Sequence, residues 1–125
     1  MKKSQQQTKI IERKHHVIDA TNQSLGRLST FIVRLLRGKN KANFVPNRDQ
    51  GDYAVIENID KIRLTGKKAY TKIYLHYSGY PGGIKEMRYS DLMSKNPKKI
   101  LENSVFKMLP DNRLRKNIMK RLIIK

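Results

Sequence analysis

Histidine and aspartate are the residues of this sequence that could support acid-base or metal-dependent chemistry. Asp49, Asp52 and His76 have the residue types of a nuclease metal site, but nothing in their spacing brings them together, and both aspartates lie among turn-forming residues. His15 and His16 open a β-favouring run, where a strand-end pair is the simpler interpretation. Cysteine is absent, so a closed zinc site has too few ligands. We therefore expect no catalytic residue, metal, cofactor or small-molecule substrate.

Positive charge is a much stronger chemical signal. Lys and Arg total 28 against 10 Asp and Glu, which gives a net charge of +18. Such a charge repels itself within a compact domain unless a polyanion compensates it. Two groups of cations recur at helical spacing, namely Arg27, Arg34, Arg37, Arg113, Lys116 and Lys120. Cationic stripes of this kind neutralise phosphates and release counterions, so we expect a nucleic-acid partner rather than a merely solvated basic surface.

Five of the six tyrosines lie between residues 70 and 89, among lysines and the segment Gly79-Tyr-Pro-Gly-Gly. Aromatic rings beside cations stack on unpaired RNA bases. Tyr80, inside the glycine-rich loop, is the best candidate for stacking. In a strand over 72–77, alternation places Tyr77 on the same face as Ile73 and Leu75, which predicts that Tyr77 lies in the core.

The elements that must position these residues alternate between strands and helices. After a β-favouring run at 15–20, apolar residues recur at helical spacing from Ser24 to Gly38, which predicts a helix over about 25–37 with one apolar and one cationic face. Residues 38–52 have the composition of an irregular basic loop. The remaining patterns predict strands at 53–57, 61–65, 72–77 and 122–125, and helices after Ser90, over 97–109 and from about 111.

The chain of 125 residues fits one domain. Residues 1–14 carry five basic side chains and one acid, and we expect a mobile basic arm there, followed by a single α/β RNA-binding domain over 15–125. No stretch approaches the roughly 20 apolar residues of a membrane span. The amino terminus also lacks the apolar segment of a signal peptide. We expect a soluble protein of a reducing compartment, the cytoplasm.

Four blocks of residues occur in a distinctive order. They are Val17-Ile-Asp-Ala with Leu25-Gly-Arg-Leu-Ser; Leu36-Arg-Gly-Lys-Asn-Lys with Pro46 and Gly51-Asp-Tyr; Thr65-Gly-Lys-Lys with Lys72-Ile-Tyr-Leu-His and Gly79-Tyr-Pro-Gly-Gly-Ile-Lys; and Val105-Phe-Lys-Met-Leu-Pro with Asn112, Leu114 and Arg121-Leu. In order and spacing they resemble the bacterial-type large-subunit ribosomal protein thirteen family, from about residue 15 to residue 125.

The resemblance implies a three-layer α/β/α sandwich around a small, mainly parallel four-stranded sheet, with basic loops and C-terminal helices. It also implies a non-enzymatic constituent of the large ribosomal subunit that binds large-subunit (23S-type) ribosomal RNA, adjoins other large-subunit proteins and supports early assembly. Together with the charge pattern it predicts an RNA-facing set: Arg27, Arg34, Arg37, Lys39, Lys41, Lys67, Lys68, Lys72, His76, Tyr80, Arg113, Lys116 and Lys120.

The sequence departs from the family pattern near its C-terminus. Phe106 stands where members usually carry glycine, and Arg115-Lys116 stands where they usually carry Gly-Arg, so we expect the backbone approach to differ there. The chain also stops at Lys125, before the tail that relatives usually have. We expect the contacts of that tail to be missing, with the basic arm at 1–14 as a partial replacement.

Two alternatives remain open at this point. One is a free RNA-binding regulator, for example a protein that represses its own message, which would be found mainly off the ribosomal subunits. The other is a metal-dependent nuclease that uses the acidic turn and His76, whose activity the substitution Asp52→Asn would abolish.

Overall fold

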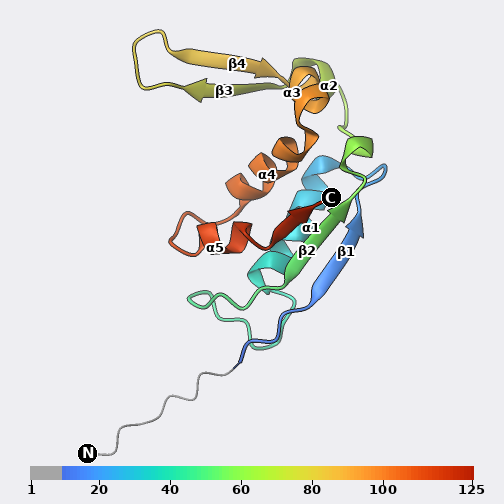
Figure 1. Ribbon diagram of the computed structural model, residues 1–125, viewed down its shortest axis with the longest axis vertical. Helices are drawn as coiled ribbons and strands as arrows, with labels where there is room; N and C mark the ends of the chain where they lie inside the picture. Colours follow the sequence, from blue (N-terminus) through green and yellow to red (C-terminus); the bar gives the residue numbers. More distant parts are fainter. Residues whose placement is uncertain (1–9) are drawn as a thin grey trace, which may run out of the picture.

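The computed structural model describes residues 10–125 of the chain; residues 1–9, which belong to the predicted basic arm, lie outside the described residues. Its elements in chain order are β1 (His15–Asp19), α1 (Leu25–Arg37), β2 (Tyr53–Glu57), the 3-10 helix η1 (Ile59–Lys61), α2 (Lys68–Thr71), β3 (Ile73–Tyr77), β4 (Ile84–Arg88), α3 (Tyr89–Lys95), α4 (Pro97–Met108), α5 (Arg115–Met119) and β5 (Leu122–Ile124). Figure 1 shows the parallel strands and the β3–β4 hairpin at different ends of the molecule, with α4 between them.

A parallel sheet of strand order β1-β2-β5 forms the centre of the fold. Parallel neighbours need a crossover connection, and α1 supplies it between β1 and β2. Side chains alternate between the two faces of each strand, so Ile18 and Ile56 share the face that is buried against the helices. The predicted strands at 15–20, 53–57 and 122–125 are confirmed within a residue of their ends.

Helix α1 has the limits that its sequence pattern predicts. Its apolar side chains line one face and are almost completely buried, with Leu28 at 1% and Ile32 at 0% exposure. The helix ends because Gly38 adopts a left-handed conformation, from which its N–H reaches the carbonyls of Arg34 and Leu35. The buried face of α4, which includes Leu101 and Val105, packs into the same core.

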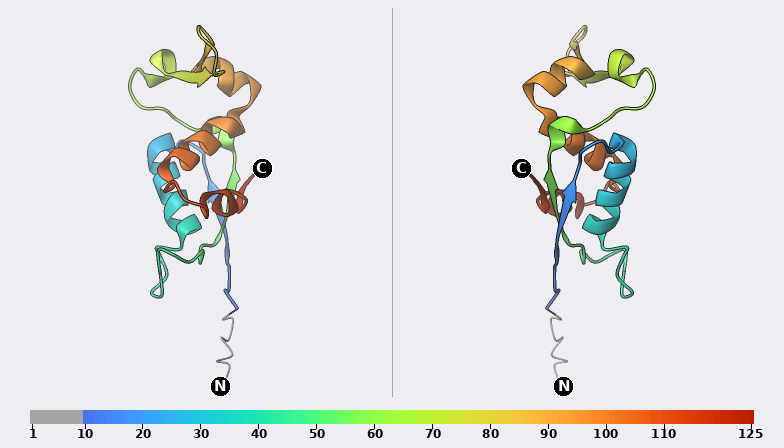
Figure 2. Two further views of the ribbon diagram at one scale, coloured as in Figure 1. Left: turned by 90° about the vertical axis from the view of Figure 1, so that its left-hand side faces the viewer. Right: turned by 90° about the vertical axis from the view of Figure 1, so that its right-hand side faces the viewer.

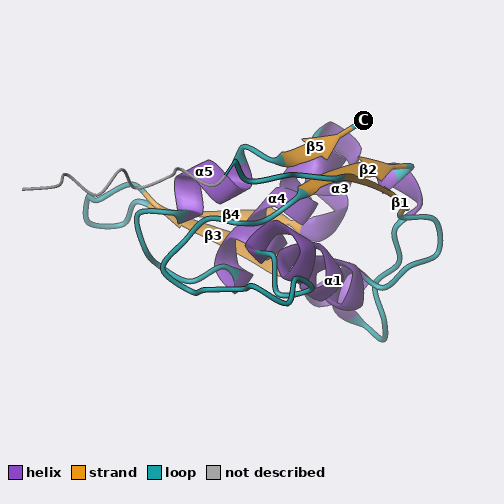
Figure 3. Ribbon diagram, turned by 90° about the horizontal axis from the view of Figure 1, so that it is seen from below, coloured by secondary structure: helices purple, strands orange, loops and turns teal. Residues whose placement is uncertain are grey.

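The predicted α/β class with a parallel sheet is confirmed, but the predicted four-stranded sheet is wrong for residues 10–125, where the parallel sheet has three strands. Residues 61–65 contribute only an isolated bridge between Ser24 and Arg63. Figures 2 and 3 show α1 and α4 on the same side of the sheet. On its other face Val17 remains 65% exposed and Ile123 39% exposed, so the described residues build two layers where three were expected.

The strand predicted at 72–77 forms, but as part of a separate hairpin. β3 pairs antiparallel with β4, and the two strands project away from the parallel sheet (Figure 1). Tyr77 is 60% exposed, so its predicted place in the core is wrong. The reason is the choice of pairing partner: Tyr74, close to the base of the hairpin, packs against the core, whereas the outer residues have no layer above or below them.

Candidate nucleic-acid interface

The cationic face of α1 is accessible. Arg27 and Arg34 are exposed opposite the buried stripe of the helix, and neither forms an ion pair within the described residues. Arg37 is half-buried and lies over the ring of Phe44, with 5.7 Å from Cζ to the ring centroid. Lys39 follows the helix end and is exposed. Their guanidinium and ammonium groups are therefore available to phosphate, with Arg37 the most restricted.

Lys41 belongs to the predicted RNA-facing set, yet its ammonium points into the protein. Its Nζ lies 2.8 Å from Asp52 Oδ1, and it donates to the carbonyl oxygens of Glu12 at 2.9 Å and Gln50 at 2.8 Å. An ammonium has three N–H donors, and these contacts use all three. Lys41 therefore ties the loop between α1 and β2 to the start of β1 rather than offering a free charge to a ligand.

Asp52 is the acceptor at the centre of these contacts. Its side chain is 1% exposed, and it also lies 2.9 Å from His16 Nε2 and accepts a hydrogen bond of 3.1 Å from the backbone N–H of Lys14. Burial raises the pKa of the Asp52 carboxyl, but the hydrogen bonds from Lys41, His16 and Lys14 outweigh that effect and hold the pKa well below its ordinary value of 3.8. The buried carboxylate is ionised at neutral pH.

Asp49 holds a second group of cations at the same end of the molecule. Arg121, which is 6% exposed, donates to both carboxylate oxygens of Asp49 at 2.5 Å and to the carbonyl of Leu36 at 2.7 Å. Arg13 Nη1 lies 3.8 Å from Asp49, and its guanidinium also donates to the backbone carbonyls of Asp49 and Gly51. We conclude that Arg13 and Arg121 shape the loop and are not part of an RNA-binding surface.

These contacts argue against the alternative nuclease site, because its residues are either bonded to other partners or far apart. Asp49 and Asp52 are occupied by arginine, lysine and histidine partners, whereas His76 lies in β3, on the hairpin at the other end of the molecule (Figure 1). In the part of the chain that the structure describes, no three His, Asp or Glu side chains lie close enough to hold a metal ion. The acidic turn is a structural centre, as its turn-forming neighbours suggested.

The hairpin presents three members of the predicted set. Lys72 Nζ lies 5.5 Å from the ring centroid of Tyr74, and His76 is exposed on β3. At the tip, Tyr80 is 76% exposed. The loop beneath it is closed by hydrogen bonds from Ser78 N to Gly83 O and from Gly83 N to Tyr80 O, and a Cβ at Gly83 would lie 2.9 Å from the backbone oxygen of Tyr80. A larger residue at position 83 would therefore force the turn that carries the exposed ring to shift.

The remaining predicted cations lie at two other places. Lys67 and Lys68 are exposed at the start of α2, near the base of the hairpin, while the C-terminal cations are exposed in or beside α5. The structure thus does not bring the predicted set into one continuous site. It distributes the set over three regions. They are α1 with the loop that follows it, the hairpin with α2, and α5 with its flanking residues. The last region carries Arg113, Lys116 and Lys120.

The two departures from the family pattern touch each other. The guanidinium of Arg115 lies 4.2 Å from the ring centroid of Phe106, and it also donates to the carbonyl of Leu109 at 2.9 Å. A glycine at either position would remove the ring or the cation. This side-chain contact joins the end of α4 to α5, while the altered backbone approach near Phe106 stays a prediction.

Sequence reasoning missed three lysines of α3 and α4 that line a groove beside the hairpin, namely Lys95, Lys99 and Lys107. A signal for them was present. Lys99, Asn103 and Lys107 recur every four residues and therefore share one face of α4. The apolar pattern of that helix drew attention to its buried side, and the exposed side was not considered as a binding surface.

A small α/β domain that displays unpaired arginines and lysines on its surface has the electrostatic character of a nucleic-acid-binding protein. Comparison with known proteins gives the particular class. The family model described as "Ribosomal protein L13" matches residues 13–124. This chain belongs to the ribosomal protein L13 family. Within the described residues, no helix is both long and apolar enough to cross a bilayer.

Similar proteins named "Large ribosomal subunit protein uL13" occur in several bacteria. The protein of Finegoldia magna is 48% identical over 112 residues, which cover 90% of this chain and 78% of that protein. The protein of Lactobacillus delbrueckii subsp. bulgaricus is 55% identical over 107 residues, covering 86% and 73%. The protein of Staphylococcus carnosus is 49% identical over 114 residues, covering 91% and 79%. The resemblance drawn from the four sequence blocks is confirmed.

Proposed function

We propose that this protein is a structural constituent of the large ribosomal subunit that binds large-subunit, 23S-type ribosomal RNA and supports early assembly beside other proteins of that subunit. The observation that carries the proposal is the family match over residues 13–124, with relatives about half identical that are named large-subunit proteins. The net charge of +18 supports a polyanionic partner. No reaction is part of this function.

The proposed RNA-binding residues are the exposed members of the predicted set together with the half-buried Arg37 and Lys72. Lys41 is left out, because its three donors are used inside the protein. The binding unit we propose begins at Arg13 rather than at residue 15, because Arg13 and Lys14 bond to the loop before β2. The proposed contacts are Arg27, Arg34, Arg37, Lys39, Lys67, Lys68, Lys72, His76, Tyr80, Arg113, Lys116 and Lys120.

The proposed mechanism is scaffolding by charge neutralisation. RNA segments repel one another through their phosphates, and cations fixed on a folded body reduce that repulsion where segments must approach. The three cationic regions lie on separate elements, with the hairpin and α2 at one end of the molecule and α1 and α5 away from them (Figure 2), so the protein is suited to contact several RNA segments at once. Phosphate and shape recognition should then dominate over the reading of individual bases.

The double substitution Arg27→Ala with Arg34→Ala tests the α1 face. We expect weaker binding to large-subunit RNA, and a plot of log affinity against log salt that is less steep by about 1.5, since each phosphate contact contributes about 0.7 to 0.9. The matched control, Lys61→Ala with Lys98→Ala, removes the same charge from exposed positions outside the proposed set. Equal slopes for the two double variants, at equal unfolding free energy, would contradict a contact through α1.

Sedimentation of cell extracts distinguishes this function from a free regulator. We expect the tagged full-length chain to migrate with large subunits and their assembly precursors, and to be released from them as salt rises. A protein found mainly outside these particles, with its own message bound to it, would instead support the regulatory alternative.

A further inference from the structure

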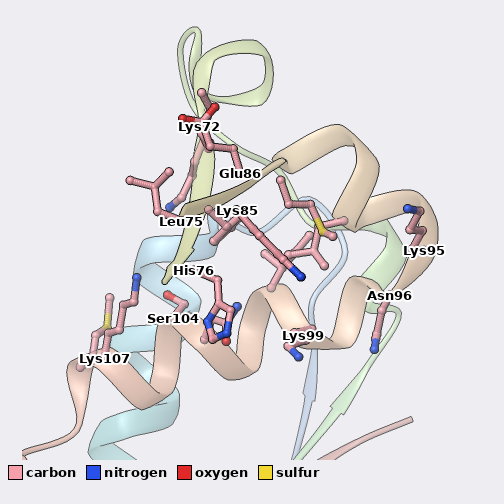
Figure 4. Close-up of a pocket in the computed structure, with 17 residues that line it drawn as sticks. Lys72, Leu75, His76, Lys85, Glu86, Lys95, Asn96, Lys99, Ser104 and Lys107 are labelled. Atoms are coloured by element: carbon pink, nitrogen blue, oxygen red, sulfur yellow. The ribbon is translucent and has the colours of Figure 1, made fainter. Parts of the chain in front are cut away.

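A groove of about 1020 Å³ lies between the β3–β4 hairpin and helices α3 and α4 (Figure 4). Its volume is at the upper end of the roughly 300–1,000 Å³ of typical small-molecule pockets. One wall consists of strand residues such as His76 and Lys85, and the other of helix residues such as Lys99 and Ser104. The groove is therefore large enough for an extended segment of a polymer.

The side chains that line the groove are strongly cationic. Glu86 is its single acidic residue. None of its lysines forms an ion pair with another residue of 10–125, so their charges are uncompensated in the free protein. The basic side chains are Lys72, His76, Lys85, Lys95, Lys99 and Lys107. This charge complements an anionic chain.

The groove also contains apolar surface between these charges. Leu92 and Ile100 are buried at 7% and 1% exposure and belong to the core, whereas Met87 of β4 is 38% exposed and shares the face of the hairpin that carries Tyr74. Exposed apolar groups flanked by cations suit a ligand that has both flat apolar parts and regularly spaced negative charges. Unpaired nucleotides have this chemistry, because every base has an apolar face and every linkage has a phosphate.

We propose that this groove holds an unpaired segment of large-subunit RNA, with its phosphates on the lysines and its bases against Tyr74 and Met87. The inference rests on the proposed function and adds to it the α4 surface, which the predicted RNA-facing set does not include. A duplex fits less well, since its paired bases stack on one another and present only their polar edges, not their apolar faces, to a protein.

Two neighbouring lysines of α4 give a matched test of the charge contacts. Lys99 lines the groove, whereas the adjacent Lys98 is exposed but does not line it. With an unpaired RNA oligonucleotide, Lys99→Ser is expected to make the salt dependence less steep by about 0.7, the value for one phosphate contact on a single strand. Lys98→Ser should leave it unchanged. Equal effects of both substitutions would overturn the proposal, as would a loss confined to duplex RNA.

A crosslinking experiment locates the bound RNA directly. The sequence contains no cysteine, so Ser104→Cys in the groove and Ser94→Cys outside it each create a single site for a photoreactive group. In reconstituted large subunits, we expect crosslinks from position 104, and not from position 94, to unpaired nucleotides. Asn103→Cys, also in the groove, replaces Ser104→Cys if that variant does not fold.

The outcomes of these experiments distinguish a failure of the groove proposal from a failure of the proposed function on which it rests. Crosslinks from position 104 to a neighbouring protein, or only to paired RNA, would overturn the groove proposal while leaving the protein a subunit constituent. The same holds for a chain that enters the subunit but gives no RNA crosslink from either groove position. Failure of the unmodified chain to bind large-subunit RNA or to enter subunits would overturn the proposed function itself.

Discussion

At the scale of single residues, Asp52 determines how the loop between α1 and β2 is attached. The loop carries exposed Lys39 and Arg48, while its Lys41 turns inward to the buried carboxylate. Removing one member of a buried ion pair leaves the other charge buried without a partner. The free energy of unfolding lost in this way exceeds the net stabilisation that the intact pair provides. The position of the loop cations therefore depends on an acidic residue that no RNA would touch.

We expect Asp52→Asn to lower the free energy of unfolding by about 2–4 kcal/mol, less than for a fully buried pair because Lys41 and His16 retain some contact with water. Asp111→Asn is the matched control. Asp111 is 93% exposed and, among residues 10–125, pairs only with Arg115 four residues further on, so its loss should change stability by less than about 0.5 kcal/mol. Urea unfolding measures both, and equal effects would show that burial of Asp52 is unimportant.

The low pKa of Asp52 also predicts how stability depends on pH. A carboxyl whose pKa is lower in the folded than in the unfolded chain stabilises the fold fully above its unfolded pKa, about 3.9, and loses that contribution as the pH falls through the folded value. Hydrogen bonds from the hydroxyl and backbone N–H of Thr21 and from Asn58 lower the pKa of Asp19 to about 2, so it acts in the same direction.

We therefore expect the unfolding free energy to be nearly constant from about pH 6 to about pH 5 and to decrease below about pH 4. The decrease should be smaller in Asp52→Asn, because the group that takes up the proton has been removed. Urea titrations across this range test the expectation. An unchanged pH dependence in the variant would mean that other carboxylates account for the loss of stability in acid.

At the scale of elements, the end of α1 and the loop before β2 approach so closely that only glycine fits at position 51. A Cβ there would lie 1.5 Å from the carbonyl oxygen of Leu36 and 2.4 Å from its carbon. Backbone atoms cannot move aside as a flexible side chain would. Gly51 thus permits the contact through which Arg121 reaches both Leu36 and Asp49.

Gly51→Ala is expected to lower the free energy of unfolding by at least about 3 kcal/mol, whereas Gly26→Ala should raise it by about 0.5 to 1 kcal/mol. The difference follows from their surroundings, because Gly26 lies in the first turn of α1 with no atom within 4 Å of an added Cβ. Thermal or urea unfolding of the two variants decides the matter. A tolerated alanine at position 51 would mean that the close approach is not maintained in solution.

Local sequence patterns predicted individual helices and strands better than they predicted which of these elements pair or pack with one another. The limits of α1 follow from apolar spacing and Gly38, which are properties of one segment. The alternation of Ile73, Leu75 and Tyr77 correctly indicated a strand, but alternation does not identify which strand pairs with it. The sequence pattern of a strand with an exposed apolar face is the same as that of a strand whose apolar face is buried in a core. This ambiguity explains both the predicted fourth strand and the misplaced Tyr77.

The candidate site was predictable only in part for a similar reason. Exposed cations at helical spacing, such as Arg27 and Arg34, follow from the sequence alone. Whether a lysine in a loop is free or paired depends on acids far away in the chain, and Lys41 meets Asp52 only after the loop has folded back. Likewise, the groove combines β3 and β4 with α4, so its lysines become neighbours only through the packing of these elements.

At the scale of the whole molecule, the cationic side chains form two sets, an inner set paired with acids and an outer set exposed on the surface. Arg13, Lys41 and Arg121 are held by Asp49 and Asp52, while most other cations face outward without an acidic partner among residues 10–125. The outward set repels itself, which disfavours the compact free protein. The same repulsion is relieved when RNA phosphates lie between the cations.

Salt should accordingly act in opposite directions on the free protein and on its complex. Raising the ionic strength from about 0.01 M to about 0.15 M shortens the Debye length from about 30 Å to about 8 Å, which screens self-repulsion and is expected to raise the Tm of the free chain. The same change should weaken RNA binding by counterion release. Thermal unfolding with and without RNA measures both effects, and a free chain destabilised by salt would contradict the charge division.

The hairpin has a consequence for affinity that follows from its architecture. β3 and β4 form a sheet of two strands only, and such sheets are marginally stable in water without a third strand or a packed layer. A ligand that settles against them must restrict their conformational entropy as well as make contacts. Stiffening the hairpin at sites remote from any ligand would then tighten association, chiefly by prolonging the lifetime of the complex.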